Sequence, residues 1–288
     1  MLKILLTGAN GQLGQEMLNR CPSGIKIEAT DYKELDITSI EACREYVSKI
    51  KPDRIVNAAA YTNVEQAEDE PEKAMLLNRD GAANLASVSK EAGIRFLHIS
   101  TDFVFSGKNS RPYSPDDRPE PLSVYGYTKL AGEEAVKSIL GKDALIIRTA
   151  WLYSRDGKNF VNTIIRLLKE QPFLKVIHNQ HGTPTSTVSL TDAIYAAIEA
   201  DARGTHHWTD AGETTWFDFA CEIQKQALKY GIIKEEKEIK PVTSDEFKTK
   251  ALRPTYSVLD KSSFISETGF SPRPWQELLE ENMKSKAV

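Results

Sequence analysis

"KILLTGANGQLGQE", residues 3–16, joins a short apolar run to a helical pattern through three glycines, Gly8, Gly11 and Gly14. In such a turn the first glycine allows a tight bend, the second lets the backbone approach a pyrophosphate, and the third lets helix pack on strand. The helix N-terminus adds a preference for negative charge. A glycine-rich turn without a ligand is the alternative, but the position between an N-terminal strand and a helix favours dinucleotide binding.

The first half of the chain alternates short β-branched runs with longer helical patterns. This rhythm predicts an α/β fold with a Rossmann-like, doubly wound parallel sheet. We expect strands at 3–7, 25–29, 54–59, 95–100 and 144–149, and helices at 12–20, 38–49, 71–92 and around 125–135. Thr38 and Glu41 are spaced as a capping box, Pro71 suits a first helical position, and Gly93 suits a helix stop.

After residue 149 the rhythm loosens, and aromatics, prolines and polar loops become frequent. A helix near 190–200 still fits the first part. We therefore expect an NAD(P)-binding Rossmann domain of residues 1–150 plus about 180–205. A smaller, interleaved C-terminal substrate-binding domain then takes about 151–179 and 206–288.

The composition of the 288 residues is that of an ordinary folded protein, with 40% hydrophobic and 27% charged residues. A formal charge of −4 argues against nucleic-acid or membrane-surface partners, which require concentrated basic charge. Cys21, Cys43 and Cys221 are too few and too widely spaced for a disulfide framework or a zinc motif. The N-terminal apolar run is too short for a signal peptide, so we expect a cytoplasmic protein.

Acidic residues follow the second strand. Asp31 lies 23 residues after Gly8, where a carboxylate can accept hydrogen bonds from the adenosine ribose. Asp31 alone favours NAD, but Lys33 could pair with a 2′-phosphate, so the choice between NAD and NADP stays open. Asp36 and Ile37 then follow at a place where an adenine ring could rest.

"SVYGYTKLAGEEA", residues 123–135, contains Tyr125 and Tyr127 upstream of a single lysine, Lys129. Residues four apart share one face of a helix, so Lys129 is the neighbour of Tyr125 and not of Tyr127. We expect its ammonium to favour the phenolate and lower the pKa of Tyr125. The spacing by itself fits a solvated helix face equally well.

Small and polar residues close the next two strands, where ligands of such sheets bind. Ala58, Ala59 and Ala60 would let a cofactor lie against the backbone, and Thr101 with its neighbours Ser100 and Asp102 lies where a reacting group would be. Hydroxyls at strand ends are often turn formers. Their coincidence with the tyrosine and lysine pair favours catalysis.

Taken together, these motifs resemble the dTDP-4-dehydrorhamnose reductase family of the extended short-chain dehydrogenase/reductase superfamily. The segments that carry the resemblance are "GANGQLG", "VNAAAYTNVEQAE", "NRDGAANLA", "ISTDFVFSG", "YGYTKLAGE", "RTAWLY", "GTPTST" and "RPTYSVLD". The resemblance implies reduction of the C4 ketone of dTDP-4-dehydro-L-rhamnose by NADPH or NADH, with NADP(H) favoured. Thr101 would hydrogen-bond the ketone, Tyr125 would donate the proton, and Lys129 would tune Tyr125 and bind the nicotinamide ribose.

The resemblance also implies the contacts. Cofactor contacts are Gly8, Asn10, Gly11, Gln12, Leu13, Gly14, Asp31, Asp36, Ile37, Ala58, Ala59, Ala60, Tyr125 and Lys129. Substrate contacts are Thr62, Val64, Thr101, Asp102, Phe103, Trp151 and Arg253. Trp151 could instead be an ordinary core residue. Arg253 suits the substrate diphosphate because guanidinium binds phosphate bidentately, with Lys248 and Lys250 as competitors.

Metal and partner expectations follow from the same resemblance. Some relatives dimerise through magnesium held by carboxylates; Glu16 matches one such position, but Val188 stands at another. We therefore expect no magnesium bridge and either a monomer or a homodimer. His206 and His207 lack an evident third metal ligand and suggest a strand edge.

Two alternatives to the reductase stay open. One is another nucleotide-sugar reductase, epimerase or dehydratase of the superfamily. The other is a non-catalytic subunit similar to the regulatory subunit of methionine adenosyltransferase, against which the presence of Thr101, Tyr125 and Lys129 speaks.

Overall fold

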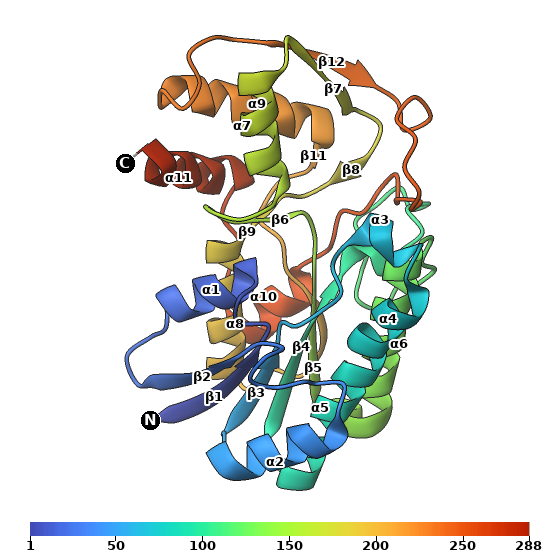
Figure 1. Cartoon of the computed structure of the whole chain (residues 1–288), viewed down its shortest axis with the longest axis vertical. Helices are drawn as coiled ribbons and strands as arrows, with labels where there is room; N and C mark the ends of the chain where they lie inside the picture. Colours follow the sequence, from blue (N-terminus) through green and yellow to red (C-terminus); the bar gives the residue numbers. More distant parts are fainter. Residues whose placement is uncertain (288) are drawn as a thin grey trace.

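A parallel six-stranded sheet lies in the lower part of the molecule in Figure 1, in the order β10-β5-β4-β3-β1-β2. The computed structural model describes residues 1–287. The strands are β1 (Leu2–Thr7), β2 (Ile25–Thr30), β3 (Arg54–Asn57), β4 (Arg95–Thr101), β5 (Ala144–Thr149) and β10 (Gly204–His207). The order reverses between β1 and β3, so a ligand is expected beyond the carboxyl ends of these two strands.

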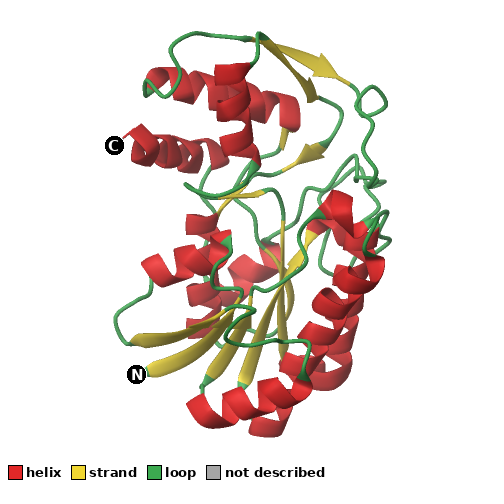
Figure 2. Cartoon of the chain, in the orientation of Figure 1, coloured by secondary structure: helices red, strands yellow, loops and turns green. Residues whose placement is uncertain are grey.

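Helices cover both faces of this sheet (Figure 2), which confirms the doubly wound fold. One face carries α2 (Ile40–Ile50), α5 (Ala82–Ala92) and α6 (Val124–Leu140); the other carries α1 (Gln12–Asn19), α8 (Thr187–Glu199) and α10 (Ser262–Thr268). Side chains alternate along β1, so Leu5 packs toward α2 and α5 whereas Ile4 and Leu6 pack toward α1 and α8.

Two local expectations are corrected. Strand β3 ends at Asn57, and Ala58–Ala60 continue as loop. The cap of α2 is Ser39, whose Oγ accepts the Ala42 N–H at 3.2 Å. Thr38 does not form the expected capping box, because the helix begins at Ile40 and its cap is Ser39; the Thr38 hydroxyl instead donates to Asp36 Oδ1 at 2.7 Å.

The long helix expected over 71–92 contains a π-helical turn. It consists of α4 (Pro71–Met75), the π turn η1 (Leu76–Gly81) and α5, and it ends at Gly93 as expected. The π turn carries Asn78, whose Oδ1 accepts the Tyr61 N–H at 2.8 Å and whose Nδ2 donates to Thr128 Oγ1 at 3.0 Å. The interruption thus joins the loop after β3 to α6, both of which border the site described below.

The C-terminal part forms the upper portion of Figure 1. It contains β6 (Leu152–Tyr153), α7 (Phe160–Glu170), β7 (Phe173–Ile177), β8 (His181–Gly182), β9 (Thr185–Ser186), β11 (Thr214–Thr215), α9 (Trp216–Lys229), β12 (Glu238–Val242) and α11 (Trp275–Ala287). Helices α7, α9 and α11 share a second core, in which Val161, Phe219 and Trp275 are buried. Short elements complete the chain: α3 (Val64–Ala67), η2 (Asp102–Val104) and η3 (Gly141–Asp143).

The division into two parts stays a prediction, and two features cross the expected boundary at residue 206. Strand β10 pairs in parallel with β5 and forms one edge of the central sheet. Trp208 and Phe264 pack in the same core as Leu190 of α8. None of the helices within residues 1–287 combines the length and the apolar character needed to cross a bilayer.

Candidate active site

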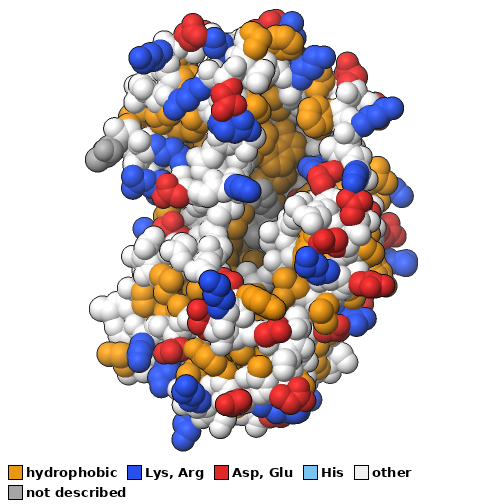
Figure 3. Space-filling model, in the orientation of Figure 1, with side chains coloured by type: hydrophobic (Ala, Val, Ile, Leu, Met, Phe, Trp, Pro, Cys, Tyr) orange, Lys and Arg blue, Asp and Glu red, His pale blue; other side chains and the backbone are white. Residues whose placement is uncertain are grey.

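A cavity of about 610 Å³ lies at the carboxyl ends of the strands. Figure 3 shows the surface hollowed between the sheet part and the C-terminal part. The predicted site residues that line it are Gly8, Gly11, Gln12, Leu13, Gly14, Asp31, Asp36, Ile37, Ala58, Ala59, Ala60, Thr62, Val64, Thr101, Asp102, Phe103, Tyr125, Lys129 and Trp151. Asn10 and Arg253 are not among the lining residues.

The glycine turn leaves no room for side chains. Gly8 has φ of 72°, and a Cβ there would lie 2.6 Å from Ala59 N. A Cβ on Gly14 would lie 2.4 Å from Gly8 O, which is why helix and turn can approach so closely. Gly11 precedes α1, whose first turn has no side-chain cap. These features fit a dinucleotide, because backbone N–H groups at a helix start can take its diphosphate.

Asp31 lies at the end of β2 beside this turn. Its Oδ2 accepts the Asn10 N–H at 3.0 Å and its Oδ1 accepts the Tyr32 N–H at 2.8 Å. These bonds fix the carboxylate toward the turn. Asn10 thus supports Asp31 through its backbone and lines a neighbouring hollow instead of the cavity.

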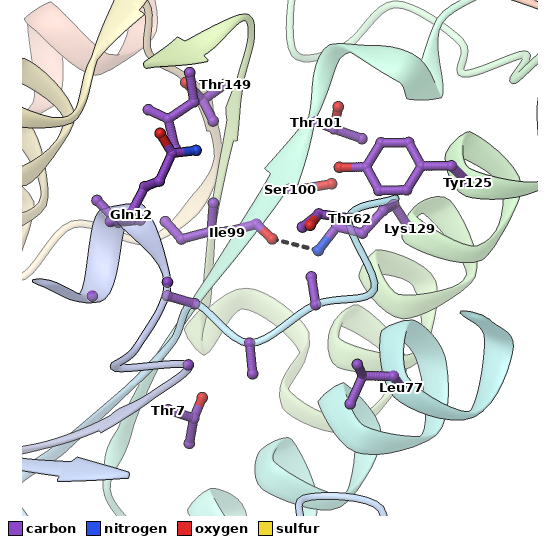
Figure 4. Close-up of a pocket in the computed structure, with 18 of the residues that line it drawn as sticks. Thr7, Gln12, Thr62, Leu77, Ile99, Ser100, Thr101, Tyr125, Lys129 and Thr149 are labelled. Carbon is purple, nitrogen blue, oxygen red and sulfur yellow. Dashed lines mark hydrogen bonds between the residues drawn. The ribbon is translucent and has the colours of Figure 1, made fainter. Parts of the chain in front are cut away.

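Tyr125 and Lys129 project from one face of α6 toward the end of β4 (Figure 4). Tyr125 and Thr101 both line the cavity at this end of β4. The ammonium of Lys129 donates to Ile99 O at 2.6 Å. Tyr127 is 58% exposed and does not line the cavity, so the helical spacing predicted the arrangement of these three side chains correctly.

The expected effect of Lys129 on Tyr125 is not what the structure shows. Burial raises the pKa of Tyr125 to about 12; the nearby Thr101 hydroxyl opposes this rise, and the charge of Asp102 adds to it. Burial lowers the pKa of Lys129 to about 8, with Glu133 acting in the opposite direction. The phenol is therefore protonated at neutral pH, the state of a proton donor.

A buried ion pair lies next to the end of β4 that carries Thr101. Glu133 of α6 accepts from Arg148 of β5 at 2.7 and 2.8 Å and from the Ser100 hydroxyl at 2.6 Å. Hydrogen bonds and the charge of Arg148 outweigh burial and hold the pKa of Glu133 below its usual range. The pair fixes the end of β4 against α6, which sets the distance between Thr101 and Tyr125.

The opposite wall is aromatic. Trp151 has φ of 47°, and its ring stacks on that of Trp216 with centroids 3.5 Å apart. A side chain at Gly182 would collide with the Trp151 ring, at 2.5 Å. Trp216, from the start of α9, was not predicted from the sequence because only the tertiary structure brings it to the cavity.

Arg253 lies outside the cavity lining. Its guanidinium forms an ion pair with Glu65 of α3, and it borders a separate surface hollow with Lys248 and Lys250. Lys250 pairs with Asp69 at 2.5 Å. The basic residues proposed for the substrate diphosphate are therefore close together, but Arg253 and Lys250 are held by carboxylates.

Lys158 is a second cavity residue that the sequence did not reveal. Its loop is fastened to the glycine turn, because Ser154 Oγ and Asn159 Nδ2 both donate to Gln12 Oε1, at 2.6 and 2.8 Å. In the described chain, residues 1–287, Lys158 forms no ion pair in this structure. A cation on a loop of the C-terminal part, fastened to Gln12, thus lines the cavity.

Comparison with known proteins agrees with this geometry. The family model described as the RmlD substrate binding domain matches residues 2–288. The spore coat polysaccharide biosynthesis protein SpsK of Bacillus subtilis is 38% identical, covering 100% of this chain and 99% of its own. The dTDP-4-dehydrorhamnose reductase structure from Clostridium acetobutylicum is 39% identical, covers both chains completely and has a TM-score of 0.94. The chain belongs to the dTDP-4-dehydrorhamnose reductase family.

A further member of the dTDP-4-dehydrorhamnose reductase family, from Bacillus anthracis, has been solved in complex with NADP. It is 37% identical, with a TM-score of 0.92 over 99% of this chain and 100% of its own. This family membership establishes the relationship on which the expected substrate and cofactor rest.

Glu16, considered from the sequence as a possible magnesium ligand, lies in no cluster of metal-ligating side chains within residues 1–287. Glu16 accepts a hydrogen bond from Thr187 Oγ1 at 3.2 Å, and Val188 follows directly. Residues 1–287 contain no group of three or more His, Cys, Asp or Glu side chains arranged to hold a metal ion. His206 and His207 lie on the edge strand β10.

Proposed function

We propose that this protein reduces the C4 ketone of dTDP-4-dehydro-L-rhamnose with NADPH or NADH to give dTDP-L-rhamnose. The observation that carries the proposal is the meeting of Thr101, Tyr125 and Lys129 with the glycine turn in one cavity. The family membership supplies the substrate class, since the Clostridium acetobutylicum relative is a dTDP-4-dehydrorhamnose reductase.

The cofactor is a nicotinamide dinucleotide, and NADP is favoured by the complex of the Bacillus anthracis relative. The turn of Gly8, Gly11 and Gly14 would hold its diphosphate, and Asp31 with Asp36 would lie near the adenosine end. When bound, the cofactor supplies a hydride to the ketone carbon.

Negative charge then develops on the ketone oxygen, and two hydroxyl groups of the cavity can stabilise it. Thr101 and Tyr125 border the same space, so both hydroxyls can be directed at one oxygen. Because the pKa of Tyr125 is about 12, the phenol carries its proton at neutral pH and can pass it to the oxygen. The nearby ammonium of Lys129 stabilises the phenolate that remains.

Substrate binding uses the two walls of the cavity. The stacked rings of Trp151 and Trp216 offer a flat apolar surface to a deoxysugar, and Thr62 and Val64 border the sugar space. Arg253 is the proposed ligand of the diphosphate. To bind it, the guanidinium must exchange Glu65 for phosphate oxygens, both of which suit its planar fork.

We place this reaction in the cytoplasm, in agreement with three free cysteines, and propose a monomer or a homodimer as the active form. No metal takes part in the proposed reaction.

The test is an assay of the purified chain with dTDP-4-dehydro-L-rhamnose and each cofactor. We expect one NADPH to be oxidised for each ketosugar reduced, with NADH as the slower or equal cosubstrate. Turnover without net oxidation of the nicotinamide would indicate an epimerase or dehydratase, and tight cofactor binding without any turnover would indicate a regulatory subunit.

A further inference from the structure

A buried chain of hydrogen bonds runs from the glycine turn to the lysine of the site. Thr7 Oγ1 donates to Asn57 Oδ1 at 2.8 Å, and Asn57 Nδ2 lies 3.1 Å from His98 Nδ1. His98 Nε2 in turn lies 3.4 Å from Lys129 Nζ. His98 is 1% exposed and no step of the proposed reaction uses it.

The orientation of the Asn57 amide is fixed by a backbone N–H, which can only donate a hydrogen bond. Its Oδ1 accepts the backbone N–H of Ala59 at 3.1 Å, so the amide oxygen must face Ala59 and Thr7. The amide nitrogen then faces His98 and donates to Nδ1. A histidine whose Nδ1 accepts a hydrogen bond carries its proton on Nε2 when it is neutral.

His98 is held neutral by its surroundings. Complete burial and the charge of Lys129 lower its pKa well below the usual value. The ring also stacks on Phe96, with an interplanar angle of 12°. An Nε2–H is therefore turned toward Lys129 Nζ.

We infer that His98 is a positioning residue for Lys129: locked by Asn57 as the Nε2–H tautomer, it presents a donor to Nζ and thereby disfavours the third proton of the ammonium. This inference rests on the proposed function for its catalytic meaning. Nζ keeps one strong acceptor, Ile99 O. A less tightly held proton makes Lys129 a better acid for returning a proton to Tyr125 after each turnover.

Other groups around Lys129 also influence whether its side chain is charged. Glu133, one helical turn further along α6, favours the charged lysine, but it is itself paired with Arg148 from β5. Tyr125 lies one turn before Lys129 on α6 and borders the same cavity. His98 and the Ile99 carbonyl are the partners of Nζ from β4.

The first test is the tautomer itself, read in the intact protein labelled with 15N-histidine by long-range 15N–1H correlation. The His98 signals are assigned by their loss in His98→Gln. We expect the Nε2–H tautomer of neutral His98 from pH 6 to pH 9. A neutral Nδ1–H ring or an imidazolium would overturn the inference. This measurement needs neither substrate nor cofactor.

The second test uses His98→Gln, whose amide can turn its oxygen toward Nζ because no tautomer restrains it. We expect the basic limb of the kcat profile to move to higher pH by about one unit, with little change in KM for the ketosugar. A limb that stays in place or moves to lower pH contradicts the inference.

Asn57→Asp offers an independent variant, since a carboxylate accepts from both Ala59 N–H and Nδ1–H. We expect the NMR spectrum to lose the neutral Nε2–H form, and persistence of that form would also contradict the inference. His206→Gln is the matched control: His206 is a buried strand histidine bonded to Arg203 O and Ser263, outside the cavity, and should leave the limb unchanged. Absence of NADPH oxidation by the unaltered protein counts against the proposed function alone.

Discussion

Two tyrosines on α6 allow the proposed role of Tyr125 as proton donor to be tested. Tyr125 lines the cavity beside Thr101, and Tyr127 is 58% exposed two residues later. Tyr125→Phe removes the proton donor and keeps the ring that contacts Phe103. We expect turnover to fall by about 10²–10⁴-fold, because that is the usual contribution of a positioned acid. Cofactor affinity, measured by NADPH fluorescence titration, should stay near normal.

Tyr127→Phe is the matched control for that prediction. It makes the same chemical change on the same helix, at a side chain that faces away from the cavity, so rate and affinity should both be unchanged. A larger loss of turnover in Tyr127→Phe than in Tyr125→Phe would contradict the assignment.

Lys158 is expected to bind the cofactor diphosphate from the side opposite the glycine turn. Its loop is fastened to Gln12, and a Cβ on Gly157 would lie 3.6 Å from Gln12 Cγ. Lys158→Ala should weaken binding of both NADPH and NADH by about three- to tenfold, as expected for one lost charge-assisted contact. Isothermal titration calorimetry measures both affinities.

Two controls show which group Lys158 contacts: the comparison of NADPH with NADH, and a variant of a neighbouring cation. A loss confined to NADPH would mean that Lys158 contacts the 2′-phosphate and not the diphosphate. Arg155→Ala, in the same loop but bordering the adjacent hollow, serves as the charge-matched control and should bind like the unaltered protein.

At the scale of single residues, local motifs predicted the part of the cavity that lies on the first strands and on α6. Gly8 follows β1, Thr101 ends β4 and Lys129 lies within α6, so their direction can be deduced from strand ends and helical spacing. Trp216 and Lys158 reach the cavity only through the packing of the C-terminal part, which no local pattern encodes. The expected fall in the pKa of Tyr125 was wrong, because burial raises this pKa and the charge of Asp102 adds to the rise.

Among the contacts between elements, we expect the one between α6 and β5 to be the most sensitive to a single substitution. Arg148→Met leaves Glu133 buried without its guanidinium partner, and we expect the free energy of unfolding to drop by about 3–5 kcal/mol. The double variant Glu133→Leu with Arg148→Met should lose less than the sum of the two single variants. Urea unfolding followed by circular dichroism measures all three.

A control for the buried pair is available on α7. Arg166 and Glu170 form an exposed ion pair at 2.6 Å, so Arg166→Met should change the free energy of unfolding by less than about 1 kcal/mol. Equal losses for Arg148→Met and Arg166→Met would show that the pair between α6 and β5 does not fix these elements.

Element positions were predictable where hydrophobic periodicity and terminal residues agree. β5 matches its expected bounds, and Gly93, with φ of 68°, ends α5 as the sequence indicates. The π turn at 76–81 was not predicted from the sequence. The cap is Ser39 and not Thr38, because α2 begins one residue later than expected and Thr38 instead forms a turn with Asp36.

At the scale of the whole molecule, buried neutral histidines make the fold sensitive to acid. Burial and the charge of Arg148 lower the pKa of His207 to about 3, and His98 shifts in the same direction. In the unfolded chain each histidine takes up a proton near its usual value of 6.5. Stability contributed by the neutral rings is therefore present above pH 6.5 and is lost as the pH falls from there toward 3.

The size of this loss is measurable. We expect each of the two histidines to cost on the order of 2 kcal/mol of unfolding free energy between neutral pH and about pH 5. His207→Gln should reduce the pH dependence of the unfolding free energy by the contribution of His207, whatever the effect of the substitution on stability at neutral pH. Urea titrations at the two pH values test this, and an unchanged difference between them in His207→Gln would contradict the assignment.

The overall architecture was predictable only for the sheet part. A regular alternation of strands and helices defines the order of the parallel sheet, because crossovers are short and right-handed. The C-terminal part consists of two-residue strands and helices around a separate core, and its place above the sheet depends on contacts such as Gln12 with Ser154 and Asn159. Such contacts join residues more than a hundred positions apart, and no local pattern predicts them.

The central claim is that this cavity directs hydride to the C4 carbon of the ketosugar and a proton from Tyr125 to its oxygen. The most direct measurement uses NADPH deuterated at the transferable nicotinamide position, with the product analysed by NMR and mass spectrometry. The account predicts one deuterium at C4 of dTDP-L-rhamnose, in step with cofactor oxidation. A product without deuterium, or with deuterium at another carbon, would contradict it.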